Sequence, residues 1–106
     1  MPVVDYKGTK FEVDEDGFLA GGIDVWCPEW IDYIKEIEGI KEVTDEHWKV
    51  IHFLQDYYKA NGIAPMIRVL CKKTGFKLKK IYELFPSGPA KGACKMAGLP
   101  KPTGCV

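Results

Sequence analysis

Hydrophobic and polar residues alternate at the start of the chain, around a short turn. The stretch VVDYKGTKFEV alternates on both sides of Lys7-Gly8. Alternation about such a pair is typical of a β-hairpin, so the pattern predicts two short antiparallel strands. The turn in DEDGF should end the second strand at Gly17. The residues expected to pack against the rest of the molecule are Val4, Tyr6, Phe11 and Val13.

Apolar residues then recur every three to four positions, which predicts two amphipathic helices. CPEWIDYIKEIEG has Pro28 in its first turn and Gly39 as its stop. TDEHWKVIHFLQDYYKANG begins with Thr44 as a cap and ends at Asn61-Gly62. The apolar faces comprise Trp30, Ile31, Ile34 and Ile37 in the first helix and Val50, Ile51, Leu54, Tyr57 and Tyr58 in the second.

Three shorter helices are predicted in the second half, each closed by a residue that ends helices. They cover about residues 65–73, 76–85 and 89–97, and their stops are Gly75, Pro86 and Gly98. The second of them should turn Leu78, Ile81, Leu84 and Phe85 inward. Ser87 is the expected cap of the last helix.

The chain ends in GLPKPTGCV, which is unsuited to regular structure. Pro100 and Pro102 can neither extend a helix nor donate to a sheet ladder. We therefore expect residues 98–106 to form a mobile C-terminal arm that becomes ordered when it docks. A chain end can enter a narrow channel as a single strand, whereas a loop would have to enter as two strands side by side.

Length and composition indicate a single small globular domain. Its 106 residues, 46% of them hydrophobic, suit a single domain over residues 1–106. No apolar run reaches the ~18–20 residues of a membrane span, and no secretory signal is recognisable at the N-terminus. We expect a cytoplasmic location without membrane insertion, where thiols are reduced and a disulfide is transient and functional.

The net charge of zero conceals an asymmetry between the halves. Residues 1–56 contain 14 acidic and 5 basic residues, whereas residues 57–106 contain 10 basic and 1 acidic. The balances of −9 and +9 suggest an electrostatically steered partner or an anionic ligand. Mutual neutralisation of the two halves within the fold is the alternative.

The four cysteines do not have the spacing of a metal site. No pair forms a CxxC motif, and His47 and His52 are distant from all four in the sequence, so no metal is expected. Cys27 and Cys71 lie at or within helices and are interpreted as small buried hydrophobic residues.

Cys94 and Cys105 are the candidate reactive pair. Cys94 lies between Lys91 and Lys95, whose charges favour a thiolate, although the C-terminal end of a helix disfavours one. Cys105 lies on the arm, which can span roughly 25–30 Å. One fixed and one swinging thiol suit a carrier in which one captures a group and the other resolves it. A tail disulfide or an incidental cysteine is the alternative.

A lysine-rich pair of helices offers a second candidate surface. The helices around Thr74-Gly75 have the outline of a helix-turn-helix, and DNA phosphates are contacted largely by Lys and Arg. No Arg, Asn or Gln begins the second helix to read bases, which favours a solvated or protein-docking face over nucleic acid. The lysines are Lys72, Lys73, Lys77, Lys79 and Lys80.

Several motifs together resemble the DsrC/TusE family over nearly the whole chain. They are FEVDEDGFL, WCPEW, FLQDYYKANGIAPMIRVL and TGFKLKKIYELFPSGPAKGACKMAGLPKPTGCV. The resemblance implies a mainly α fold: an orthogonal helical bundle with a helix-turn-helix-like pair, an N-terminal β-hairpin and a mobile C-terminal arm.

The resemblance also implies a function in dissimilatory sulfur metabolism, because both Cys94 and Cys105 are present. In such family members Cys105 accepts sulfite-derived sulfur from the siroheme-containing alpha and beta subunits of dissimilatory sulfite reductase. Cys94 then forms a trisulfide with it, which a membrane-associated, heterodisulfide-reductase-like complex reduces. Arg68 matches a family arginine near the cysteines. The protein is then a co-substrate more than a stand-alone catalyst, with no siroheme or iron–sulfur cofactor of its own.

Three alternatives remain open at this point. Family members that relay persulfide sulfur to tRNA thiolation keep the penultimate cysteine and usually lack the upstream one. A DNA-binding regulator with a thiol switch and a non-catalytic structural subunit are the others. The direction of the pathway, reductive or oxidative, is also open.

Overall fold

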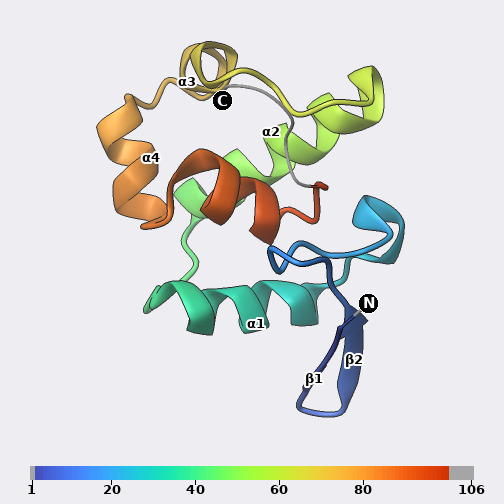
Figure 1. Ribbon diagram of the computed structural model, residues 1–106. Coiled ribbons are helices and arrows are strands. Elements are labelled where there is room, and N and C mark those ends of the chain that lie inside the picture. The colour runs from blue at the N-terminus through green and yellow to red at the C-terminus, as the bar shows by residue number, and fades with distance from the viewer. Residues whose placement is uncertain (1, 101–106) are drawn as a thin grey trace.

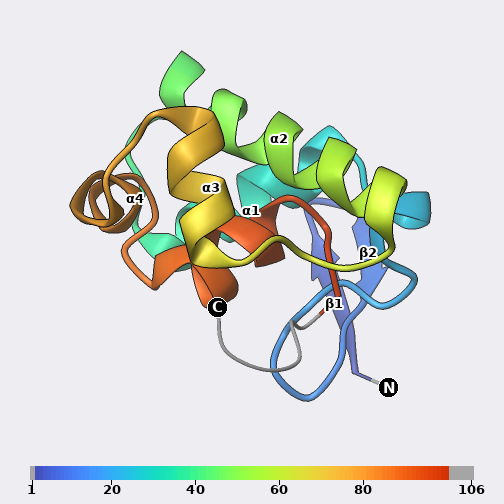
Figure 2. The ribbon, with the colours of Figure 1, turned by 90° about the horizontal axis from the view of Figure 1, so that it is seen from above.

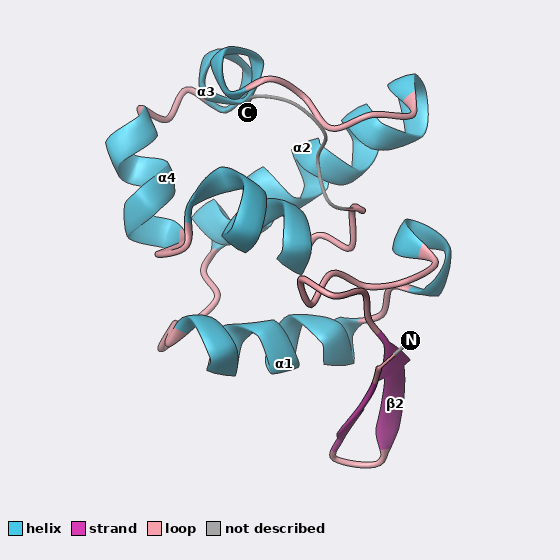
Figure 3. Cartoon of the chain, viewed as in Figure 1, coloured by secondary structure: helices cyan, strands magenta, loops and turns pink. Residues whose placement is uncertain are grey.

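The computed structural model describes residues 2–100 and shows one hairpin followed by helices (Figures 1 and 3). Along the chain the elements are β1 (Val3–Tyr6), β2 (Thr9–Glu12), the 3₁₀ helix η1 (Gly22–Val25), α1 (Pro28–Glu38), α2 (Asp45–Asn61), α3 (Ile67–Thr74), α4 (Leu78–Leu84) and the π-helical η2 (Pro89–Cys94). The prediction of a mainly helical fold with an N-terminal hairpin is confirmed.

The hairpin forms because its turn residues accept unusual backbone angles. Lys7 and Gly8 have φ values of 50° and 90°, which a two-residue turn between twisted strands requires. Tyr6 therefore pairs with Thr9, and the Gly8 amide donates to the Asp5 side chain at 3.1 Å. On the packed side, Tyr6 contacts Tyr33 of α1 with ring centroids 5.6 Å apart. The hairpin is thus fastened to the first long helix.

The two long helices begin and end at the expected residues. Thr44 is the N-cap of α2 and forms a capping box with His47. Gly39 and Gly62 follow α1 and α2 in the left-handed conformation, with φ of 74° and 73°. Ile37 departs from the expected face, because its side chain is 55% exposed.

The segment from Gly88 to Leu99 lies at the centre of the molecule, among α1, α2 and α4 (Figure 1). Its apolar side chains are almost fully buried, and Leu99 is 0% exposed. This segment joins a core that all the long helices share, comprising Phe11, Trp30, Ile34, Val50, Ile51, Leu54, Leu70, Ile81, Phe85, Ala93, Met96, Ala97 and Leu99. The final helix is therefore a central element and not a peripheral one.

The paired helices α3 and α4 cross at a steep angle. Figure 1 shows α3 end-on with α4 in side view, and Figure 2, after a quarter turn, shows the reverse. Thr74 closes α3 by donating its hydroxyl to the Leu70 carbonyl at 2.7 Å, and Gly75 ends it with a φ of 79°. The expected helix-turn-helix-like pair is present, although Leu78 is 46% exposed and does not turn inward.

Two expectations for the second half are corrected. Ser87 does not cap the last helix: Gly88 is the N-cap, and Ser87 instead donates its amide and hydroxyl to the Glu38 carboxylate. The first residues of the expected arm, Gly98 and Leu99, are buried in the core because side chains from distant elements hold them. Residues 101–106 of the arm lie outside the described residues.

Candidate functional site

Cys94 ends the π-helical segment η2 and is buried. Its side chain is 2% exposed, and burial raises the pKa of the thiol to about 12. A thiol in this environment is protonated at neutral pH and is a poor nucleophile. The described conformation therefore stores Cys94 in an unreactive state.

The two neighbouring lysines do not offset this burial. Lys91 is exposed, and the Nζ atom of Lys95 lies 5.0 Å from the ring centroid of Phe18, in the loop after the hairpin. Lys95 is thus occupied by a cation–π contact with an aromatic ring. Their proposed role beside a Cys94 thiolate stays a prediction for a conformation in which the thiol is exposed.

Three glycines allow the segment around Cys94 to pack closely on its neighbours. A Cβ on Gly88 would lie 2.9 Å from the Tyr82 ring, one on Gly92 2.8 Å from Glu38 Oε1, and one on Gly98 2.6 Å from Trp26 Cδ1. At Gly92 and Gly98 the close atoms include the Cβ atoms of Phe85 and Trp26, at 2.9 and 3.0 Å, which cannot move aside easily. At Gly88 the Tyr82 ring is exposed and can move, but a φ of 91° favours glycine there. The GPAKGACKMAG stretch therefore has its glycines because other elements touch its backbone.

Three side chains satisfy the carbonyl groups at the end of this segment. A helix leaves its last carbonyls without intrahelical partners. Here Trp30 Nε1 donates to the Lys95 carbonyl at 2.7 Å, Trp26 Nε1 to Met96 at 3.0 Å, and Gln55 Nε2 to Ala97 at 3.0 Å. The donors come from three different parts of the fold, which fixes the segment relative to all of them.

The last described residues of the chain are linked directly to Cys94. The amide of Leu99 donates to the Cys94 carbonyl at 3.0 Å. We call Gly98, Leu99 and Pro100 the arm root. Pro100 lies at the rim of a cavity of about 310 Å³, which Asp14, Leu19, Ala20, Gly21, Gly22, Ile23, Asp24 and Tyr58 also line. The described chain thus ends at a depression in the surface.

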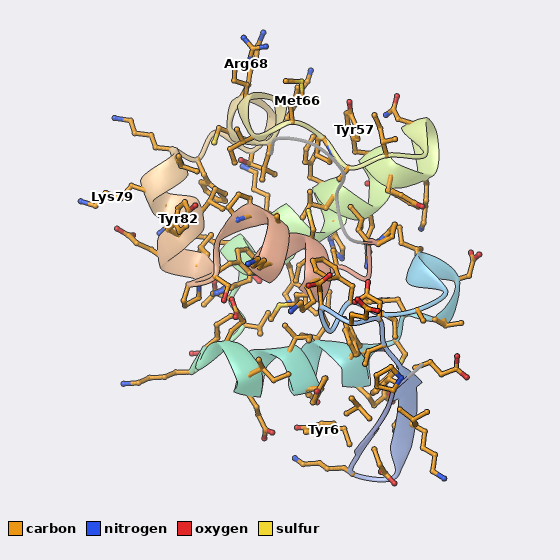
Figure 4. The ribbon with its side chains drawn as sticks, viewed as in Figure 1. Tyr6, Tyr57, Met66, Arg68, Lys79 and Tyr82 are labelled. Carbon is orange, nitrogen blue, oxygen red and sulfur yellow. The ribbon has the colours of Figure 1, made fainter. Side chains whose placement is uncertain are left out.

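The other site residues expected from the sequence lie in different places. Arg68 is exposed on α3, and its side chain extends away from the body with no partner within residues 2–100 (Figure 4). Cys27 and Cys71 are free thiols that are half-buried against the core. Cys105 lies outside the described residues. The role of Arg68 beside the cysteines therefore stays a prediction.

Charged groups elsewhere suggest no second chemical site. Over residues 2–100, no cluster of three or more His, Cys, Asp or Glu side chains could hold a metal ion. In the same range, no helix combines the length and apolarity needed to cross a membrane. On α3 and α4, Lys72, Lys73, Lys77 and Lys79 are exposed, while Lys80 pairs with Glu46 at 3.0 Å. DNA binding by this face stays untested.

The sequence analysis did not identify the three side chains that donate to these carbonyls. Only Gln55 could have been recognised from the sequence pattern. Gln55 lies one position after Leu54 on the apolar face of α2, and a polar residue at a core position indicates a buried hydrogen bond. His47 occupies an equivalent position four residues before Ile51. Trp26 and Trp30 carried no such signal, because a tryptophan also fits an ordinary core.

Comparisons with known proteins identify the family. The sequence matches the DsrC like protein family over residues 5–106. It is 71% identical, over the full length of both chains, to the dissimilatory-type sulfite reductase subunit gamma of Nitratidesulfovibrio vulgaris. It is 39% identical to the sulfurtransferase TusE homolog of Haemophilus influenzae, over 98% of this chain and 100% of the relative.

A solved structure agrees in fold as well as in sequence. A chain in the crystal structure of dissimilatory sulfite reductase I has a TM-score of 0.92 and 70% identity, covering 99% of this chain and 100% of that one. Family match, full-length identity and shared fold lead to one conclusion: the chain belongs to the DsrC family.

Proposed function

We propose that this protein is a sulfur carrier and co-substrate of dissimilatory sulfite reductase, working in the cytoplasm. Cys105 accepts the partly reduced sulfur, and Cys94 attacks it to form a trisulfide within one chain. The observation that carries this proposal is the 3.0 Å hydrogen bond from the Leu99 amide to the Cys94 carbonyl. This bond ties the arm root to the residue that we propose as the resolving cysteine.

The proposed cycle balances in atoms and electrons. One sulfite, two protein thiols, two electrons and four protons give one trisulfide and three waters. Four further electrons and four protons release hydrogen sulfide and restore both thiols. The reductase supplies the first electrons, and a membrane-associated, heterodisulfide-reductase-like complex supplies the rest.

The partners follow from the proteins that this chain resembles. The relative in Nitratidesulfovibrio vulgaris is a gamma subunit of the reductase, and the matching solved chain belongs to a reductase crystal structure. These similarities support docking on the siroheme-containing alpha and beta subunits. The carrier itself needs no cofactor, because the sulfur is held covalently on cysteine.

Burial of Cys94 fits a resolving role better than a capturing role. A resolving thiol is required only after the other cysteine has been loaded, and protection until then prevents premature reactions. Its pKa of about 12 keeps the thiol protonated while it is buried. Lys91, three residues before Cys94, is the cation that we propose to favour the thiolate once Cys94 is exposed.

Intact-mass measurement after turnover with the reductase and sulfite tests the proposal. The wild type gains the mass of one sulfur in a trisulfide, and reductant removes it. Cys105→Ala carries no sulfur, whereas Cys94→Ala is loaded but forms no internal bridge. Cys71→Ala, which alters a half-buried thiol on α3, is the matched control and behaves as wild type. Sulfur loading on Cys105→Ala would refute the proposal.

A persulfide relay for tRNA thiolation is the second candidate. It is favoured by the 39% identity to a TusE homolog over nearly the full chain. In that role Cys105 passes a persulfide to the next protein, and Cys94 is not used. Persulfide transfer by Cys94→Ala at the wild-type rate, together with no loading by the sulfite reductase, supports the relay.

A further inference from the structure

The arm root is held by side chains that lie far from it in the sequence. The indole of Trp26 covers Gly98, where a Cβ would lie 2.6 Å from Cδ1. The same indole donates to the Met96 carbonyl, and Gln55 donates to the Ala97 carbonyl, both at 3.0 Å. Trp26 follows η1 and Gln55 belongs to α2, so two separate elements grip one short stretch of chain.

These bonds cannot be replaced easily by water. Met96 and Ala97 are both 0% exposed, so a carbonyl that loses its donor is left without a partner among residues 2–100. An unsatisfied buried carbonyl destabilises the folded conformation, so the backbone is expected to shift until the carbonyl finds another donor. The position of the arm root therefore depends on Trp26 and Gln55.

The position and direction of the arm root limit which places Cys105, a few residues further along the chain, can reach. The encounter of two groups on one chain is governed by an effective concentration, which depends on the geometry of the link between them. Because the Leu99 amide is bonded to the Cys94 carbonyl, a shift of the arm root also shifts Cys94.

We infer that Trp26 and Gln55 are positioning residues for the reaction between Cys94 and Cys105. By bonding the Met96 and Ala97 carbonyls, they fix the position of the arm root, which joins Cys94 to the segment that carries Cys105. This inference rests on the proposed carrier function, in which the two cysteines must react with each other. Ordinary helix capping, which supports stability alone, is the competing interpretation.

The measurement is the equilibrium of the intramolecular disulfide in a glutathione buffer. Two protein thiols and one oxidised glutathione give one protein disulfide and two reduced glutathiones, so the reaction is balanced. Peptide mapping by mass spectrometry assigns the bridge to Cys94 and Cys105. The equilibrium constant gives the effective concentration of one thiol at the other, separately from global stability.

Trp26→Phe and Gln55→Met each remove one donor and keep most of the side-chain volume. Each should lower the effective concentration by about two- to tenfold, the effect of one typical hydrogen bond on an equilibrium constant. Each should also speed hydrogen exchange at the Leu99 amide. Trp48→Phe is the matched control, because Trp48 packs edge-on against Trp26 at 6.5 Å and has no hydrogen bond to the arm root.

The outcomes separate the two interpretations. An effective concentration in both variants equal to that of Trp48→Phe overturns the positioning role, even if their melting temperatures fall. If Trp26→Phe does not fold, Gln55→Met decides alone. A wild type that forms no disulfide and carries no sulfur overturns the proposed function instead, and this is seen before any variant is made.

Discussion

His47 joins the start of α2 to the end of α4. Its Nε2 atom donates to the Leu84 carbonyl at 2.8 Å, and its Nδ1 atom accepts from the Thr44 amide at 3.0 Å. Both contacts require the neutral ring, because a proton on Nδ1 would face the Thr44 amide proton. Burial accordingly lowers the pKa of His47 below its ordinary value of 6.5.

This arrangement makes stability depend on pH on the acid side. Because the folded-state pKa is lowered, the contribution of His47 is complete above pH 6.5 and is lost as pH falls below it. Chemical denaturation between pH 5 and 8 should show this decline in wild type. His47→Gln should remove the part of this pH dependence that comes from His47, and it should lower the free energy of unfolding at pH 8 by about 1–3 kcal/mol. An unchanged profile in His47→Gln contradicts the assignment.

Burial of Cys94 should make it slow to react in the folded protein. Iodoacetamide should modify Cys94 far more slowly than the half-buried Cys27 and Cys71, and at comparable rates after unfolding. Mass spectrometry of quenched digests measures the rates. Equal labelling of the three thiols in the folded state would show that Cys94 is accessible.

The same burial makes stability depend on pH on the alkaline side. The pKa of Cys94 rises from 9.0 to about 12, so its contribution is complete below pH 9.0 and is lost as pH rises through this range. Denaturation of wild type and Cys94→Ala at pH 8 and 10 should show a steeper loss in wild type. Identical slopes would contradict the shift.

Close contact at Gly98 should make its substitution more costly than that of an open glycine. Gly98 and Gly62 have similar φ values, 83° and 73°, but only Gly98 is covered by Trp26. Gly62→Ala should cost about 1–2 kcal/mol from backbone strain alone. Gly98→Ala should cost a further 1–3 kcal/mol, about the effect of overpacking. Urea denaturation measures both, and equal losses would argue against the contact.

The Glu38 contact with Ser87 should couple α1 to the Cys94 segment. A double-mutant cycle with Glu38→Gln and Ser87→Ala should give a coupling free energy of about 1 kcal/mol. Glu36→Gln, which changes an exposed carboxylate on the same helix, is the control and should not couple to Ser87. A coupling near zero would mean that the contact does not stabilise the fold.

Local sequence signals were sufficient to predict where most helices and the hairpin turn lie. Pro28, Thr44, Gly39 and Gly62 begin or end helices where their backbone preferences require, and Lys7-Gly8 makes the turn of the hairpin. These residues act over a few neighbouring positions, which is why a pattern reveals them.

Long-range contacts explain what local signals could not supply. Gly98 and Leu99 look like the start of a flexible arm, yet they are buried because Trp26 and Gln55 hold the preceding carbonyls from 70 and 42 residues away. Ser87 has the chemistry of a cap, but Glu38 competes for it. The burial of Cys94 likewise depends on neighbours that only the tertiary fold brings together.

The glycine contacts around Cys94 also have a consequence for oxidative damage. A thiolate is oxidised by peroxide through sulfenic to irreversible sulfinic acid, and the reaction needs both ionisation and access. In this closely packed segment the Cys94 side chain is 2% exposed and its pKa is raised to about 12, so the thiol has neither. In the described conformation, the packing that holds the arm root therefore also protects Cys94 from overoxidation.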